Sequence, residues 1–100
     1  MNLNQIHNVF FIGIGGIGMS ALARYFKTIG KNVSGYDKTP SMLTDELIAS
    51  GIDIHFEDRI DLISKDYYVE NTLVIITPAV PVTHSQWNYF LERRSEERRV

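Results

Sequence analysis

The chain has 100 residues, a formal net charge of −2, 44% hydrophobic residues and no cysteine. This length fits one domain with a buried core, and the absence of cysteine excludes disulfides and thiolate metal sites. The small negative charge argues against nucleic acid as a partner, and no apolar run approaches the roughly 20 residues that span a bilayer. Residues 1–7 lack the basic and apolar regions of a signal peptide, so we expect a soluble, cytoplasmic protein.

Two strand–helix units are predicted in the first fifty residues. Residues 9–12 form a short apolar run that ends at glycine, which is typical of a strand buried on both faces. The next apolar residues recur at helical spacing up to Gly30, a natural C-terminal cap. The expected apolar face of this helix consists of Ile17, Ala21, Leu22, Tyr25, Phe26 and Ile29. Residues 32–36 are predicted to form a second strand that ends before Asp37.

The remaining residues continue the alternation. Thr39 and Pro40 indicate a helix start, with a capping hydroxyl and a proline in the first turn. The buried stripe expected for this helix is Leu43, Leu47 and Ile48, and residues 50–51 close it. Residues 52–56 and 72–77 are predicted strands, residues 59–64 a brief helix, and residues 85 to about 94 a last helix.

This order predicts the α/β class: a Rossmann-like open parallel sheet of about four to five strands with helices on both faces. We expect one domain over residues 1–91. Residues 92–100 contain four arginines and three glutamates before the final valine, and they are expected to be a charged tail or a domain-boundary linker.

A glycine-rich turn joins the first strand to the first helix. Gly13 permits the tight turn, Gly15 removes a side chain where a ligand approaches, and Gly18 lets the helix pack closely on the strand. The free N–H groups of the first helical turn then face an anion. This spacing, followed by an acid at the end of the second strand, predicts a diphosphate site. The alternative is a glycine turn without a ligand.

Other polar residues support the site to different degrees. Asp37 suits a hydrogen bond to ribose hydroxyls, although it also suits a cap on the turn before Thr39. The loop of residues 77–79 follows the fourth strand and is expected to form a second wall of the site. The three histidines, His7, His55 and His84, match no metal-ligand pattern and are expected to be structural or solvent-facing. Glu57, Asp58 and Asp61 are interpreted as an acidic surface turn.

The sequence of residues 9–23, VFFIGIGGIGMSALA, resembles the opening of the Mur ligases. The resemblance continues through VSGYD at residues 33–37 and VIITPAV at residues 74–80, and it spans residues 6 to about 90. Enzymes of that family have three domains. The first holds the UDP end of a sugar nucleotide, the second binds ATP and magnesium, and the third helps to bind an amino acid. The family reaction activates the muramyl carboxylate as an acyl phosphate, which the amine of L-alanine attacks.

The resemblance implies an N-terminal substrate-binding domain of a peptidoglycan-precursor ligase, whose partner is UDP-N-acetylmuramate. The implied UDP contacts are Gly13, Gly15, Gly16, Ile17, Gly18, Met19, Ser20, Asp37, Thr77, Pro78 and Ala79. No catalytic or metal-binding residue is implied. The ATP loop of the family, a Gly-Thr-His-Gly-Lys-Thr type of segment, is absent, so ATP and magnesium would belong to a central domain that this chain lacks. The chain alone is therefore expected to bind its nucleotide, to contact the other domains of a parent enzyme, and to ligate nothing.

Two features depart from the family pattern. Many members have a Gly-His pair near the uracil, where this chain has Glu57 and Asp58, so no uracil contact is assigned. The arginine-rich ending also differs from the usual continuation.

Two other classes remain open at this stage. An NAD-binding regulatory module would use the same glycines and Asp37. A non-catalytic protein that dimerises through the fold would leave the glycines without a ligand.

Overall fold

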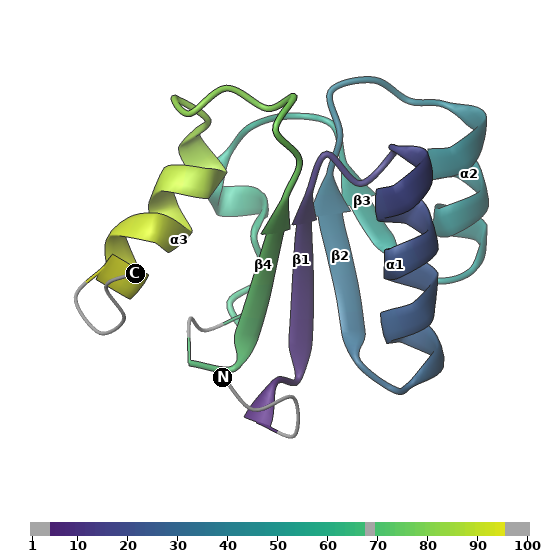
Figure 1. Cartoon of the computed structure of the whole chain (residues 1–100), viewed down its shortest axis with the longest axis horizontal. Helices are drawn as coiled ribbons and strands as arrows, with labels where there is room; N and C mark the ends of the chain where they lie inside the picture. The colour runs from purple at the N-terminus through teal and green to yellow at the C-terminus, as the bar shows by residue number, and fades with distance from the viewer. Residues whose placement is uncertain (1–4, 68–69, 96–100) are drawn as a thin grey trace.

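The computed structural model describes residues 5–67 and 70–95, which form an open sheet with helices on both faces (Figure 1). The elements in chain order are β1 (Asn8–Ile12), α1 (Ile17–Thr28), β2 (Asn32–Tyr36), α2 (Met42–Ala49), β3 (Asp53–His55), the 3₁₀ turn η2 (Ile60–Leu62), β4 (Thr72–Ile76) and α3 (Ser85–Ser95). The described part of the sheet has four parallel strands in the order β3-β2-β1-β4. The predicted fold class is confirmed.

The central strand β1 supplies both layers of the core. Successive side chains of a strand point to opposite faces, so Val9 and Phe11 pack with α1 and α2, whereas Phe10 and Ile12 pack with Phe90 of α3. All five residues of β1 are buried. In Figure 1, α1 and α2 accordingly cover one side of the sheet and α3 covers the other.

The buried face of α1 differs from the expected one. Ser20, Ala23 and Phe26 are buried, whereas the expected face residues Ile17, Leu22, Tyr25 and Ile29 are exposed by 82%, 37%, 54% and 44%. Among the large apolar residues of that face, Phe26 alone is buried. The prediction was wrong because it followed every apolar residue, while the sheet accepts a narrow stripe of small residues, Ser20 and Ala23, beside Phe26.

The start of α2 also differs. Ser41 is the N-cap: its hydroxyl accepts a hydrogen bond from the N–H of Thr44, and the Thr44 hydroxyl accepts one from the N–H of Ser41. This reciprocal capping box places Pro40 before the helix and not in its first turn. Leu47 is fully buried as expected, but Ile48 is 44% exposed.

The last helix continues through residues 92–95, past the expected boundary at residue 91, and residues 96–100 lie outside the described part of the chain. Within the described residues, no helix is both long and apolar enough to cross a membrane.

Candidate functional site

A cleft of about 410 Å³ lies at the carboxyl edge of the sheet. β1 lies between β2 and β4, and the connections after β1 and β4 lead to helices on opposite faces (Figure 1). A crevice is expected where neighbouring connections diverge in this way. The lining residues are Gly13, Gly15, Gly16, Tyr36, Asp37, Lys38, Thr77, Ala79, Val80, Pro81 and His84. We call residues 13–19 with Asp37 the glycine wall, and residues 77–86 with Asp58 the α3 wall.

The turn after β1 depends on Gly13. Its φ is +96°, and a Cβ at this position would lie 2.2 Å from Cγ2 of Thr77. Both the left-handed backbone and the contact with the opposite wall therefore require glycine. The N–H groups of Gly13 and Ile14 donate to the carbonyl of Tyr36 at 2.7 and 3.0 Å. These bonds fix the glycine wall to the end of β2.

Asp37 supports the glycine wall directly. Its Oδ1 accepts a hydrogen bond from the N–H of Gly15 at 3.0 Å, and its Oδ2 accepts one from the N–H of Thr39 at 3.1 Å. Asp37 therefore caps the turn before Thr39, as the alternative interpretation expected, and its contact with ribose stays a prediction. A Cβ on Gly15 would lie 3.0 Å from the same Oδ1. The close approach of Asp37 is thus a second reason for glycine at this position.

The N-terminus of α1 suits an anion. The N-cap, Gly16, makes no side-chain capping bond, and the first turn contains no acid. The first N–H groups of a helix lack intrahelical partners, and the positive end of the helix dipole lies there. A Cβ on Gly18 would have nothing within 4 Å. The expected close packing of Gly18 on the strand is therefore wrong, and this glycine leaves the surface above the first turn open.

The side chains of the other predicted contact residues in the first turn of α1 point elsewhere. Ser20 is buried, and its hydroxyl donates to the carbonyl of Ile17 at 2.9 Å. Met19 packs against the core under α1, and the side chain of Ile17 lies in solvent. Their side chains do not line the cleft, so any contact to a ligand would come from their backbone.

The loop after β4 forms the first part of the α3 wall. The N–H of Thr77 donates to the carbonyl of Ile12 at 3.1 Å, which extends the pairing of β4 with β1 by one residue. Thr77 and Ala79 line the cleft as expected, whereas Pro78 does not.

Five lining residues were not anticipated from the sequence: Tyr36, Lys38, Val80, Pro81 and His84. Tyr36 and Lys38 flank Asp37, so the end of the second strand was a usable signal for them. His84 immediately precedes the predicted helix at residues 85–94. Its place at the carboxyl edge depends on how α3 docks on the sheet, and no local sequence pattern predicts that docking.

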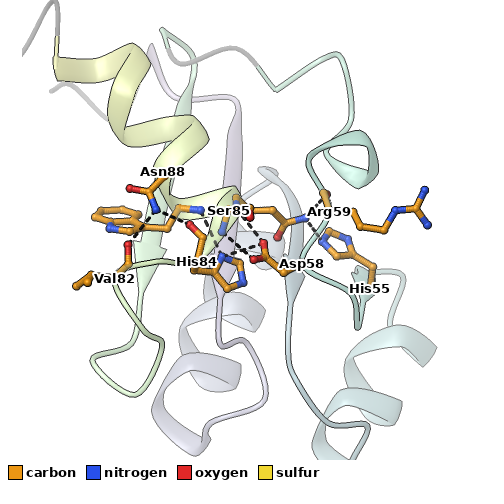
Figure 2. Close-up of polar contacts among 9 residues, drawn as sticks. His55, Asp58, Arg59, Val82, His84, Ser85 and Asn88 are labelled. Carbon is orange, nitrogen blue, oxygen red and sulfur yellow. Dashed lines mark hydrogen bonds and ion pairs between the residues drawn. The ribbon is translucent and has the colours of Figure 1, made fainter.

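Asp58 and His84 form the polar part of the α3 wall (Figure 2). The carboxylate of Asp58 accepts hydrogen bonds from the N–H groups of Ser85 and Gln86 at 2.7 and 2.9 Å, which caps α3. Nδ1 of His84 lies 3.2 Å from Oδ1 of Asp58. The expectation of a surface acidic turn was therefore wrong for Asp58, which lies against α3.

The pKa values of Asp58 and His84 are both lowered, which favours the charged form of the aspartate and the neutral form of the histidine. Burial alone would raise the pKa of Asp58, but the backbone donors of Ser85 and Gln86 and the nearby His84 more than offset it and hold the pKa below its usual range. Burial lowers the pKa of His84, against the opposing effect of Asp58. The stable pair at neutral pH is thus a carboxylate beside a neutral imidazole.

His55 lies beside the cluster and touches Gln86. Their Nε2 atoms are 2.6 Å apart, and Nε2 of Gln86 also donates to the carbonyl of Arg59 at 2.7 Å. Among residues 5–67 and 70–95, no group of three or more His, Cys, Asp or Glu side chains is arranged to hold a metal ion.

Comparison with known proteins identifies the family. The sequence pattern of the Mur ligase family, catalytic domain, matches residues 8–98, so the chain belongs to the Mur ligase family. Within that family, it is 87% identical over 93 residues to a UDP-N-acetylmuramate–L-alanine ligase of Flavobacterium psychrophilum, and 54% identical over 91 residues to the enzyme of that name from Parabacteroides distasonis. These alignments cover 93% and 90% of this chain, but only 21% and 20% of the relatives.

A solved structure agrees with these relatives. The fold matches UDP-N-acetylmuramate-alanine ligase MurC from Thermotoga maritima with a TM-score of 0.75 and 32% sequence identity. The match covers 87% of this chain and 19% of that enzyme. The chain therefore spans about a fifth of the length of the enzymes that it resembles.

Proposed function

We propose that this chain is the N-terminal UDP-binding domain of a UDP-N-acetylmuramate–L-alanine ligase. The observation that carries the proposal is the cleft between the glycine wall and the α3 wall, in a chain 87% identical to part of an enzyme with that name. UDP-N-acetylmuramate is the proposed ligand, and its diphosphate is the group proposed to face the glycine wall.

Backbone N–H groups carry the proposed diphosphate contact. Those of residues 16–19 lie at the open, acid-free start of α1, where helix N-termini bind phosphate groups. Lys38 lines the same cleft and adds a positive charge. Asp37 already accepts hydrogen bonds from Gly15 and Thr39, so a ribose hydroxyl would use its remaining lone pairs.

The chemistry of ligation is proposed to belong to the parts of the longer relatives that this chain does not span. Those parts would bind ATP and magnesium, activate the muramyl carboxylate and join L-alanine to it, and they would contact this domain. The parent enzyme would act in the cytoplasm, in peptidoglycan biosynthesis. The 100-residue chain alone is expected to release no phosphate from ATP in the presence of L-alanine and the sugar nucleotide.

Titration of the ¹⁵N-labelled chain tests the ligand. Adding UDP-N-acetylmuramate or UDP should shift the backbone amide signals of residues 15–19, and NAD should shift them less. A stronger response to NAD would instead favour the NAD-binding module, which also uses this type of loop. No response to any of the three would contradict a nucleotide site.

Gly16→Val tests the position of the diphosphate. Gly16 lines the cleft with an ordinary extended backbone (φ −68°, ψ 153°), and a Cβ there would meet no atom closer than 3.7 Å. Added bulk should therefore weaken UDP binding at least about tenfold by blocking the anion, with little strain. Ala49→Val, an exposed change at the far end of α2, is the control and should bind normally. Normal binding by Gly16→Val would place the diphosphate elsewhere.

A further inference from the structure

His84 has an unusual environment for a buried histidine. It is only 7% exposed, it lines the cleft, and its ring lies 4.5 Å from the ring of Tyr36 between centroids. Its Nε2 is buried and has no hydrogen-bond partner among the described residues. Buried polar atoms are normally paired, so an unpaired one at a ligand cleft indicates a missing partner.

The protonation state of the ring follows from its neighbours. Asp58 accepts two backbone hydrogen bonds at the start of α3 and is ionised at neutral pH, so it can only accept from His84. The 3.2 Å contact with the carboxylate Oδ1 therefore favours a ring proton on Nδ1. The N–H of Trp87 donates to the same nitrogen at 3.4 Å, which would need an unprotonated Nδ1, but this contact is longer than the one with the charged carboxylate and is the weaker of the two.

A neutral ring protonated at Nδ1 presents a lone pair at Nε2. Such an atom accepts a hydrogen bond from an N–H or O–H group and repels the oxygens of a phosphate. Within the proposed nucleotide, the donors are the imide N–H of uracil and the hydroxyls of the ribose. The diphosphate contains no donor when ionised, and the glycine wall already suits it.

We propose that His84 is a specificity residue whose Nε2 accepts a hydrogen bond from the nucleoside part of the bound nucleotide, and that Asp58 is the positioning residue that fixes its tautomer. The proposal rests on the proposed UDP function. It assigns the nucleoside end of the ligand to the α3 wall and the diphosphate end to the glycine wall.

His84→Phe removes the acceptor and keeps a ring against Tyr36. It should bind UDP roughly three- to tenfold more weakly than the unchanged chain, the range expected for one hydrogen bond. His7→Phe is the matched control, because His7 is exposed and precedes β1 at the opposite edge of the sheet. Equal UDP affinity of His84→Phe and His7→Phe would overturn the proposal.

Two UDP analogues identify the donor. One carries a methyl group on the imide nitrogen of uracil, and the other lacks the ribose 2′-hydroxyl. The analogue without the relevant donor should bind the unchanged chain and His84→Phe equally. A loss on His84→Phe that is the same for UDP and both analogues would show a general packing defect and would overturn the assignment.

The nitrogen chemical shifts of the His84 ring give a readout that needs no variant. In the unchanged chain at pH 7.5, Nδ1 should be protonated and Nε2 unprotonated, and UDP should move the Nε2 signal toward that of a hydrogen-bonded acceptor. Asp58→Asn should allow the other tautomer and weaken this response. A protonated Nε2 in the free chain, or an Nε2 signal unchanged by UDP, would contradict the proposal.

The proposed UDP function and the proposed role of His84 can be refuted separately. If UDP shifts the amides of residues 15–19 but leaves the His84 ring unchanged, the proposed function stands and the role of His84 is refuted. If UDP shifts neither, both are refuted.

Discussion

The glycine wall presents backbone to the cleft, whereas the α3 wall presents side chains. In the first, N–H groups of Gly13 and Gly15 are held by acceptors at the end of β2. In the second, Asp58 and His84 belong to distant segments and meet only because α3 docks on the sheet. The backbone wall is fixed by conformation and has no room for a Cβ at Gly13 and little at Gly15, whereas the side-chain wall is fixed by charge and hydrogen bonding and responds to pH.

The largest effect on stability is expected from Gly13→Ala, which disturbs the conformation of the glycine wall. A left-handed backbone and a clash with Thr77 should together lower the free energy of unfolding by about 3 kcal/mol, as urea unfolding would measure. Gly18→Ala is the matched control. Its Cβ meets open space in a helix, so the free energy of unfolding should stay level or rise by about 0.5–1 kcal/mol. Equal losses in the two variants would contradict the structure of this turn.

Asp58→Ala attacks the α3 wall and should have the next largest effect. It removes the acceptor for the first two N–H groups of α3, and losing such a cap costs about 1–2 kcal/mol. Asp61→Ala is the control, because Asp61 makes only an exposed ion pair with Arg59, worth about 0–1 kcal/mol. Thermal unfolding of the two variants would compare them. A larger loss from Asp61→Ala would show that Asp58 does not cap the helix.

Asp37→Asn asks whether the acid supports the loop, the ligand or both. One of its two oxygens becomes an amide, so one of the bonds to Gly15 and Thr39 is lost, at about 0.5–1.5 kcal/mol of stability. A loss of UDP affinity beyond that change, measured by calorimetry, would support the ribose contact as well. Unchanged stability and affinity would remove Asp37 from both roles.

The smallest effect is the response of the α3 wall to mild acid. The pKa of His84 is lowered mainly by burial, so the unfolded chain takes up this proton at about pH 6.5, before the folded chain does. The contribution of His84 to the free energy of unfolding is therefore complete above about pH 6.5. It declines as the pH falls toward the lower pKa that His84 has in the folded chain. The groups that face His84 are Asp58, His55 and Tyr36, and of these Asp58 opposes the shift. His84→Gln should flatten the dependence of stability on pH between 7.5 and 5.5, and an unchanged slope would assign it to another group.

The difference between the walls also explains what the sequence revealed. The parallel sheet, the glycine turn and the contact of Thr77 with the site follow from local runs and spacings, so they were predicted. The face of α1 was not, because Ser20 and Ala23 are buried where larger apolar residues were available. The place of Asp58 and His84 was missed because it depends on how α3 docks. The functional assignment came from resemblance, since a glycine turn and an acid suit UDP and NAD alike.

The strand order has a consequence for when the chain becomes able to bind. Asn8 of β1 pairs with Thr72 of β4, so the two walls are joined by chain segments that are synthesised far apart. Such non-local pairing forms late and slowly during folding. UDP binding would therefore report completion of the whole sheet, because a chain that ends before β4 has one wall and no cleft. Ligand at about 100 times its Kd would stabilise only the completed fold, by about 2.7 kcal/mol.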